Sequence, residues 1–378
     1  MKKIGWSRTG LLLVPLVLGL VGGAVACSKS KDKAAKGDKL ESFETVLGKL
    51  SVPPGNPQTP AKIELGKLLF FDPRLSGNKQ ISCASCHDPA KGFTTPVARF
   101  VGPKGELGRN TPTVWNSAYV DFPFWDGRTS SLEEQAGGPM RAEAEMGSKV
   151  PELIAALKAV PEYQQKFKDV YGDNGLTFTN VAGAIAAFER TIVSADSPYD
   201  KFQAGDKGAL TDEQKRGKDL FFGERTSCNS CHTAPLFTDN KFHAIGVPQE
   251  GPKTEDLGRF NVTQDEQDKF AFKTPTLRNV DRTGPYMHTG GLQSLEEVVA
   301  FYNGGAGNAP NKDPRIRRLN LTPDESKALV AFLKALTDES HNVSPPKLPG
   351  QALPSSRSGA NSVAAPKLLH SPRFTPVR

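Results

Sequence analysis

The pattern Cys-x-x-Cys-His occurs twice in this chain, as CASCH at residues 83–87 and as CNSCH at residues 228–232. Two thiols at this spacing can form thioether bonds to the vinyl groups of a haem, and the adjacent histidine then binds the iron. A redox dithiol does not need the histidine, and a zinc ribbon rarely has its cysteine pairs so far apart. The pattern therefore predicts two covalent c-type haems, with these attachment and ligand residues: Cys83, Cys86, His87, Cys228, Cys231 and His232.

An internal duplication surrounds the two motifs. The sequence GKLLFF at residues 66–71 precedes the first motif, and GKDLFF at residues 217–222 precedes the second. TPTV at residues 111–114 recurs as TPTL at 274–277, and SLEE at 131–134 recurs at 294–297. Both of these pairs are 163 residues apart, so this block repeats without a gap. The chain is predicted to hold two tandem copies of one domain.

Each copy is predicted to end in a helix. TPDE at residues 322–325 supplies an N-cap, a proline at the first helical position and a glutamate at the third. Each copy has an apolar stripe at helical spacing near its end. In the second copy it consists of Leu329, Phe332, Leu333 and Leu336, and in the first copy of Val181, Ile185, Phe188 and Ile192. TDEQ at residues 211–214 predicts another helix start, and no run alternates clearly enough for a sheet. The predicted fold is mainly α, with two tandem cytochrome-c-like (class I) haem domains and long loops.

The beginning of the chain has the pattern of an export signal. Basic residues precede an apolar run at residues 11–21, which is too short for a membrane-spanning helix. Ala24 and Ala26 precede Cys27, which predicts a lipoprotein-type signal peptide over residues 1–26 with Cys27 acylated. The alternative is ordinary cleavage near Ala26, which leaves a free thiol. We expect an exported protein on the periplasmic side of a bacterial membrane, held by a lipid anchor.

The formal charge of +7 belongs to the ends of the chain. Without residues 1–42 and 343–378, the remainder carries about −3. A slightly acidic body argues against a nucleic-acid partner and suits a basic electron-donor protein. The predicted parts are a flexible tether at residues 27–44, an N-terminal haem domain at 45–205, a C-terminal haem domain at 206–342 and a disordered Pro/Ser-rich basic tail at 343–378.

Residues 45–340 resemble the bacterial di-haem cytochrome c peroxidases and their relative MauG. The resemblance depends on both haem motifs, on FWDGR at residues 124–128, on residues 135–147 and on GPYMHTG at residues 284–290. It implies that the N-terminal haem is peroxidatic and that the C-terminal haem transfers electrons. It also implies that peroxide is the substrate and that a c-type cytochrome or another small electron-donor protein supplies electrons.

The resemblance also implies the groups on the second face of each iron. Tyr302, within FYN, matches the position of the second ligand of the C-terminal haem, which is methionine in typical peroxidases and tyrosine in MauG. Met287 is the alternative ligand. Pro139 stands 163 residues before Tyr302 and cannot bind iron, so the first haem is expected to have an open face. Because no histidine lies between His87 and His232, that haem is expected to need no reductive activation.

Three further residues take catalytic roles from the same resemblance. Glu145 matches the distal glutamate that moves a proton between the peroxide oxygens, and Gln135 matches its hydrogen-bonding companion. From composition alone, Glu145 would be a solvated surface residue. Trp125 matches the residue that carries electrons between the haems, although a core aromatic is the plainer interpretation.

A calcium ion between the domains is the last group that the resemblance implies. Asn110, Thr283 and Pro285 match its ligands, through one side-chain oxygen and two backbone carbonyls. Isolated residues of these types are more often simply turn formers.

The favoured function is a di-haem cytochrome c peroxidase that reduces hydrogen peroxide to water. One alternative is a MauG-like enzyme that oxidises a residue of a partner protein through high-valent iron. The alternative of another class is a non-catalytic di-haem electron carrier, which Glu145 and the open first haem argue against. The sequence does not name the donor or the oligomeric state, and a homodimer stays open.

Overall fold

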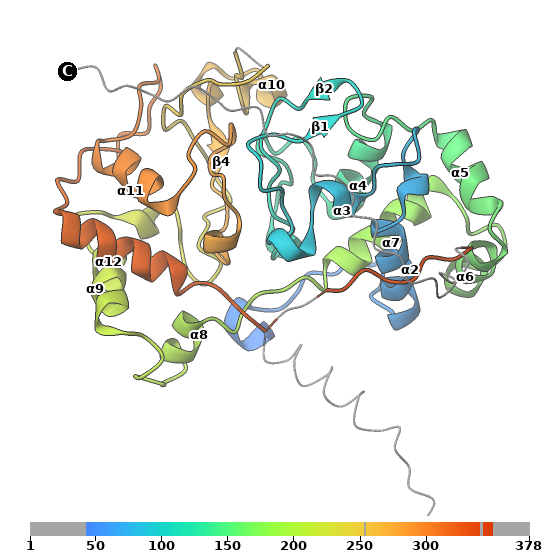
Figure 1. The fold of residues 1–378 in the computed structure, drawn as a ribbon, viewed down its shortest axis with the longest axis horizontal. Helices are drawn as coiled ribbons and strands as arrows, with labels where there is room; N and C mark the ends of the chain where they lie inside the picture. Colours follow the sequence, from blue (N-terminus) through green and yellow to red (C-terminus); the bar gives the residue numbers. More distant parts are fainter. Residues whose placement is uncertain (1–42, 253–254, 341–342, 351–378) are drawn as a thin grey trace, which may run out of the picture.

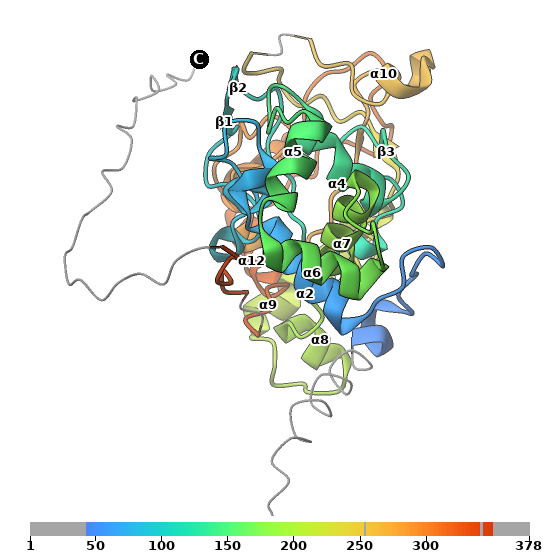
Figure 2. The same cartoon turned by 90° about the vertical axis from the view of Figure 1, so that its right-hand side faces the viewer.

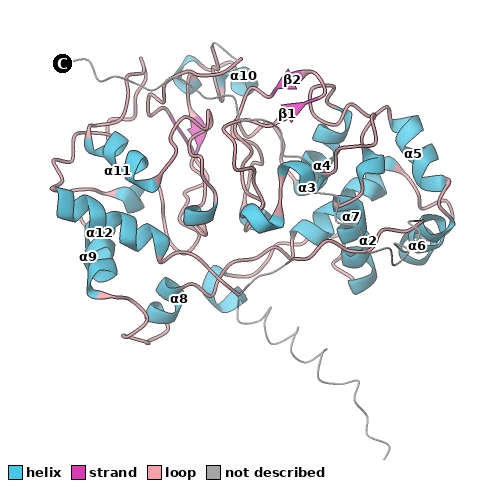
Figure 3. Ribbon diagram, viewed as in Figure 1, coloured by secondary structure: helices cyan, strands magenta, loops and turns pink. Residues whose placement is uncertain are grey.

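The computed structural model describes residues 43–252, 255–340 and 343–350, and these residues form two mainly helical domains beside each other (Figures 1 and 3). The α-helices have these bounds: α2 Pro60–Phe70, α3 Cys83–Cys86, α4 Leu132–Arg141, α5 Val150–Lys158, α6 Pro161–Tyr171, α7 Phe178–Glu189, α8 Pro198–Gln203, α9 Asp212–Phe222, α10 Phe260–Thr263, α11 Leu295–Asn303 and α12 Pro323–Lys334. Residues 43–47 are also helical. The mainly helical fold expected from the sequence is confirmed.

Strands and 3-10 helices are short. Strand β1 (Val101–Gly102) pairs antiparallel with β2 (Gly105–Glu106), and β3 (Phe242–His243) pairs antiparallel with β4 (Phe272–Lys273). The 3-10 helices are η1 Pro73–Leu75, η2 Pro89–Lys91, η3 Ser117–Tyr119, η4 Cys228–Ser230, η5 Glu266–Asp268 and η6 Val280–Arg282. Long loops therefore join the helices, and these loops face the junction between the domains (Figure 1).

The two domains repeat one helix crossing. In the N-terminal domain α2 packs on α7, and in the C-terminal domain α9 packs on α12. A Cβ atom on Gly66 would lie 1.8 Å from the carbonyl oxygen of Ala184, and a Cβ on Gly217 would lie 1.8 Å from that of Ala328. Only glycine allows so close an approach of two helices. The GKLLFF and GKDLFF segments thus mark the same structural position.

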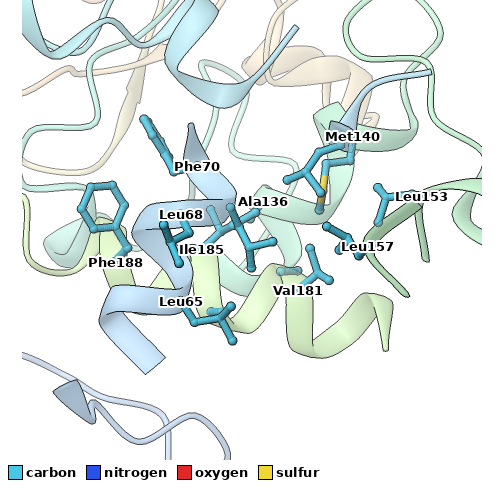
Figure 4. Packing of buried hydrophobic residues seen from close by; sticks show 14 of the residues in the cluster. Leu65, Leu68, Phe70, Ala136, Met140, Leu153, Leu157, Val181, Ile185 and Phe188 are labelled. Carbon is cyan, nitrogen blue, oxygen red and sulfur yellow. The ribbon is translucent and has the colours of Figure 1, made fainter. Parts of the chain in front are cut away.

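The core of the N-terminal domain lies between α2, α4, α5 and α7 (Figure 4). Apolar residues at helical spacing on α2 and α7 meet there, with the rings of Phe70 and Phe188 5.3 Å apart. Met140 of α4 and Leu157 of α5 are fully buried against them. Seen from the side of the N-terminal domain, α5 and α6 lie on its outer face (Figure 2).

The core of the C-terminal domain is rich in aromatic rings. Phe221 of α9 and Phe332 of α12 lie 5.2 Å apart, which matches the Phe70 and Phe188 pair of the first domain. Phe237 and Tyr199 complete this cluster, with 5.2 Å between their ring centres. Edge-on ring contacts of this kind add to the stability gained from burying apolar surface.

The predicted helix starts are confirmed. Thr211 and Thr322 form capping boxes at α9 and α12, in which each threonine accepts a hydrogen bond from the third helical residue. Ser131 at α4 and Ser294 at α11 accept from Glu134 N and Glu297 N at 3.1 Å. The repeated SLEE segment therefore begins one helix in each domain.

Two predicted boundaries differ from the structure. Helix α8, assigned to the N-terminal domain by a boundary after residue 205, packs on the C-terminal core through Tyr199. Arg278 pairs with Asp200 of this helix at 2.8 Å, and both side chains are buried, which fixes α8 there. Periodicity alone could not show this, because a six-residue helix has too short an apolar pattern to reveal its partner.

The start of the predicted disordered tail also needs correction. Leu348 is buried in the N-terminal core, and the carbonyl oxygen of Pro349 accepts a hydrogen bond of 2.8 Å from Arg74. Burial of one leucine and one main-chain bond order residues 343–350 against this domain. The signal peptide, Cys27, most of the tether and the remainder of the tail lie outside the described residues. Within the described ranges, no helix is both long enough and apolar enough to cross a membrane.

Candidate haem sites and the junction between them

A cavity of about 730 Å³ lies between the two domains and is lined mainly by apolar surface from both. Residues of both Cys-x-x-Cys-His motifs face it, and so do the other residues predicted for the sites: Trp125, Gln135, Pro139, Glu145, Asn110, Thr283, Pro285, Met287 and Tyr302. The long loops between the helices bring these segments together, although they are more than two hundred residues apart at the extremes. The cavity is of the kind in which proteins bind cofactors.

The two motif histidines are held in the same way. His87 Nδ1 lies 3.1 Å from the carbonyl oxygen of Phe93, and His232 Nδ1 lies 3.0 Å from that of Phe237. A hydrogen bond at Nδ1 fixes the ring and leaves Nε2 available to bind a metal. Burial lowers the pKa of both histidines, which favours the neutral imidazole that binds iron.

No disulfide joins the motif cysteines, so their sulfur atoms can bond to haem. Burial raises the pKa of the Cys86 thiol to about 12, and the Glu145 carboxylate adds to this shift. Burial raises the pKa of Cys83, Cys228 and Cys231 as well. Paired thiols beside an oriented imidazole, at the edge of a largely apolar cavity, are the donor set of a covalent haem. The residues present therefore fit one haem in each domain.

The residues predicted for the distal side of the N-terminal site lie on α4 and the turn after it. Gln135 and Pro139 are one helical turn apart on α4, so both point from the same face. Glu145 follows the end of the helix, where its amide donates to the carbonyl oxygen of Ala142 at 2.9 Å. The structure thus brings these three predicted residues to the same cavity.

Two influences act on the carboxyl group of Glu145. Burial raises its pKa, and the guanidinium of Arg128 opposes this shift. Arg128 is held by Asp126, with Nη1 at 2.9 Å from Oδ1, and its guanidinium lies 3.4 Å from the ring centre of Phe124. A carboxyl group in this environment can take up and release a proton nearer to neutral pH than an exposed one.

The C-terminal site presents both candidates for the second iron ligand. Tyr302 lies on α11 and faces the cavity, and burial raises the pKa of its phenol, with further contributions from Cys231 and Cys228. Met287 also lines the cavity, in a left-handed backbone conformation with φ of +69°. Tyr302 is thus near the second motif, which supports it as the ligand, while Met287 remains the alternative.

Trp125 is held from both domains. Its Nε1 donates to the carbonyl oxygen of Asn110 at 2.9 Å, and its own carbonyl oxygen accepts from Lys273 N at 2.8 Å. Asn110 and Lys273 are 163 residues apart and so hold equivalent positions in the two copies. The ring of His288 lies 6.3 Å away, edge-on. Trp125 therefore occupies the junction between the two haem sites.

An ion-pair network holds the FWDGR segment in place. Arg109 donates to Asp126 at 2.7 Å and to Asp256 of the C-terminal domain at 2.5 Å. Arg259 donates to the carbonyl oxygens of Asp126 and Gly127. These charged hydrogen bonds cross between the domains and fix the backbone on both sides of Trp125.

The three residues predicted to bind calcium gather at the same junction. Asn110 is buried, and its Nδ2 donates to the carbonyl oxygen of Ala98 at 2.9 Å. This hydrogen bond does not use the side-chain oxygen, which is the predicted calcium ligand. Thr283 and Pro285 line the same cavity. The set offers hard oxygen donors, which suit calcium.

Two charged residues in the cavity were not anticipated from the sequence. Glu189 at the end of α7 is 6% exposed, and burial raises its pKa to about 8. Lys273 faces the junction, and burial lowers its pKa to about 7, against the opposing effect of Asp121 and Asp126. The alignment of the two repeats could have indicated that Lys273 lies at this junction, because Lys273 is equivalent to Asn110.

Fold and site together define a di-haem c-type protein with two cytochrome-c-like domains. Residues 60–208 match the family model described as di-haem cytochrome c peroxidase. The chain is 39% identical to cytochrome-c peroxidase IdrP1 of Denitromonas iodatirespirans over 88% of this chain and 96% of that protein. It is also 39% identical to methylamine utilization protein MauG of Methylorubrum extorquens, over 86% and 91% of the two chains.

A solved structure has the same architecture. The crystal structure of a MauG-like protein associated with microbial copper homeostasis superposes with a TM-score of 0.71 at 33% identity, over 76% of this chain and 93% of that one. The chain belongs to the di-haem cytochrome c peroxidase family, and it is an oxidoreductase of the peroxidase class with two c-type haems.

Proposed function

We propose that this protein reduces hydrogen peroxide to water at the N-terminal site, with electrons that a small donor protein delivers to the C-terminal site. Haem bound at the two sites supplies the redox-active iron and the place for peroxide. The observation that carries the proposal is that Gln135, Pro139 and Glu145 line the same cavity as Cys86 and His87 of the first motif.

The distal residues divide the proton work between them. Glu145 takes a proton from one peroxide oxygen and returns it to the other as the O–O bond breaks, and the two electrons and a further two protons complete two molecules of water. Gln135 orients the peroxide by hydrogen bonding. The side chain of Pro139 has no atom that can bind iron, and its ring is small. It therefore leaves room for peroxide in the pocket. Trp125 carries electrons from the C-terminal site toward this pocket.

A second candidate function is favoured by Tyr302. An anionic oxygen ligand favours oxidised iron more than the thioether of methionine does, and this bias suits the MauG-like oxidation of a residue on a partner protein. The absence of any histidine between His87 and His232 also fits this alternative. We retain the peroxidase as the main proposal, because Glu145 and Gln135 serve both reactions and only the partner differs.

Other finer features belong to the same proposal. We assign a calcium ion to Asn110, Thr283 and Pro285 at the junction, where it would hold the two domains in register. The apolar run at residues 11–21 and Cys27 support export to the periplasm and a lipid anchor.

The proposal is tested with the holoprotein produced together with haem-maturation machinery. Mass spectrometry should find two haems, attached through Cys83/Cys86 and Cys228/Cys231. Peroxide consumption is then followed with hydroquinone, a neutral donor, and with reduced cytochrome c. Peroxide-dependent oxidation of either donor supports the peroxidase. A two-haem protein that oxidises neither, but forms cross-links or oxidised residues on an added protein, would favour the second function.

A further inference from the structure

The loop that joins α11 to α12 is strongly basic. Between residues 312 and 318 it carries four cations against one acid, Asp313: Lys312, Arg315, Arg317 and Arg318. This segment, which we name the basic loop, runs along the side of the C-terminal domain that faces away from the N-terminal domain (Figure 1). The function described above assigns no role to it.

The basic loop contacts the second haem motif directly. Arg315 Nη1 donates to the carbonyl oxygen of Ser230 at 3.0 Å, and Arg317 Nη2 donates to that of Glu224 at 3.3 Å. Ser230 lies between the two cysteines of the motif and is exposed. The cations therefore border the outer edge of the C-terminal haem site, next to Cys231.

Much of this positive charge is not neutralised. Arg315 is paired with Asp313 at 2.7 Å, and Arg225 beside the loop is paired with Glu325. Arg317 and Arg318 are both exposed, and neither forms an ion pair with a carboxylate in the described part of the chain. Glu224 is the exposed acid next to them. The surface next to Ser230 thus carries two exposed arginines that no carboxylate of the described residues pairs with.

Arg315 and Arg317 also line the cavity, and Arg315 does so where it contacts the segment between the two motif cysteines. The vinyl groups that form thioether bonds are on the opposite edge of the macrocycle from the propionates. Cations that contact the segment between Cys228 and Cys231 would therefore lie beside the thioether edge of a bound haem. A charged and exposed surface at this edge, from which electrons reach the iron over a short path, fits an encounter with another redox protein.

We propose that the basic loop and the exposed edge of the CNSCH motif form the docking surface for an acidic electron-donor protein. The inference rests on the proposed function in one respect, the arrival of electrons at the C-terminal site. Opposite charges steer such encounters and fix their orientation. The overall charge of about −3 for residues 43–342 suggested a basic donor. Salt at 0.1 M, however, screens charges beyond roughly 10 Å, so the charges at the contact surface decide which partner binds.

The test uses the full-length holoprotein and two forms of one probe. Cytochrome c is used in its native basic form and after succinylation of its lysines, which makes it acidic without changing its fold class. Binding of each form is measured by biolayer interferometry without peroxide, at an ionic strength of about 10 mM, where screening is weak. We expect the succinylated form to bind at least about tenfold more tightly and to lose this advantage at high salt.

Charge-reversal variants locate the surface. Arg317→Glu with Arg318→Glu should remove the preference for the succinylated form. Lys104→Glu with Lys158→Glu changes the net charge equally, on exposed residues of the N-terminal domain, and should preserve it. The proposal is overturned if the parent protein prefers native cytochrome c, or if both double variants have the same effect. If the arginine variant does not fold, the salt dependence of the parent protein decides alone. Failure of peroxide consumption with hydroquinone would reject the peroxidase and leave the binding result independent.

Discussion

Pro139 and Tyr302 are each the eighth residue of a helix that begins after a serine N-cap, α4 in the first domain and α11 in the second. Both face the cavity between the domains. A ring without a donor atom and a phenol therefore hold equivalent positions over the two haem sites. In the proposed function, Pro139 leaves the first site open and Tyr302 supplies a ligand at the second, which would separate a reactive site from an electron-transfer site.

The first prediction concerns this difference. The oxidised holoprotein should give one high-spin haem that is five-coordinate or weakly water-bound, and one six-coordinate haem. Tyr302→Phe removes the oxygen ligand, so it should open the second haem or recruit a water, and electron paramagnetic resonance should show altered low-spin signals. Met287→Leu is the matched control and should leave those signals nearly unchanged. Loss of the six-coordinate signature in the Met287 variant alone would make methionine the ligand.

The second prediction concerns Glu145. Glu145→Gln keeps the size of the side chain but removes the proton acceptor, so both haems should still be incorporated. Proton transfer by a positioned side chain accelerates a reaction by roughly a hundred- to ten-thousand-fold. The rate of peroxide turnover should therefore decrease by a factor in this range. Glu143→Gln, on an exposed neighbour in the same turn, is the control. Turnover of the Glu145 variant within about threefold of the parent would show that another group moves the proton.

The third prediction is a pH dependence with a defined direction. Glu145 acts as a carboxylate, so the kcat/KM for peroxide should fall as the pH drops through its pKa, which burial raises above the ordinary value. Because the charge of Arg128 opposes this shift, Arg128→Gln should raise the pKa and move the acid limb to higher pH. Arg141→Gln, on the exposed end of α4, should not move it. A limb that shifts to lower pH in the Arg128 variant would contradict the assignment.

How much the sequence could predict depends on the range of each signal. The helix caps and the repeated segments are short patterns, and they are confirmed by Ser131, Ser294 and the crossings at Gly66 and Gly217. Local patterns cannot show which distant segments pair. Arg109 meets Asp256 across 147 positions of the chain, and no periodicity predicts such a pair.

Buried charged residues are a second feature that the sequence does not reveal. Glu189 ends a helix whose neighbours form an apolar stripe, so its sequence context gives no sign that it faces a cofactor cavity. Leu348 lies in a segment rich in proline and serine, where composition indicates disorder, yet Leu348 and Val343 pack on the N-terminal core and Pro349 O accepts a hydrogen bond from Arg74. Composition averages over such individual contacts.

The fourth prediction concerns Trp125. Trp125→Phe keeps an aromatic ring but removes the indole and its hydrogen bond to Asn110 O, so electron transfer between the two haems should slow. The rate is followed by stopped-flow spectroscopy after partial reduction of the holoprotein. Phe167→Leu, in the N-terminal core and not among the residues that line the cavity, is the control, and it should lower stability without slowing this transfer. Equal effects of both variants on the transfer rate would indicate that Trp125 only packs.

The last prediction concerns the helix crossings that place the haem motifs. In Gly217→Ala the new Cβ would meet the carbonyl oxygen of Ala328, which is main chain and cannot move aside, so α9 and α12 must separate. Overpacking of this kind costs about 1–3 kcal/mol or more, and the melting temperature of the C-terminal domain should fall. Gly55→Ala is the control, since nothing lies within 4 Å of its new Cβ. Because α9 leads directly into the CNSCH motif, the Gly217 variant should also incorporate less haem at Cys228 and Cys231 than at Cys83 and Cys86. Mass spectrometry of the two haem peptides measures this ratio, and an unchanged ratio together with an unchanged melting temperature would show that the crossing tolerates a side chain.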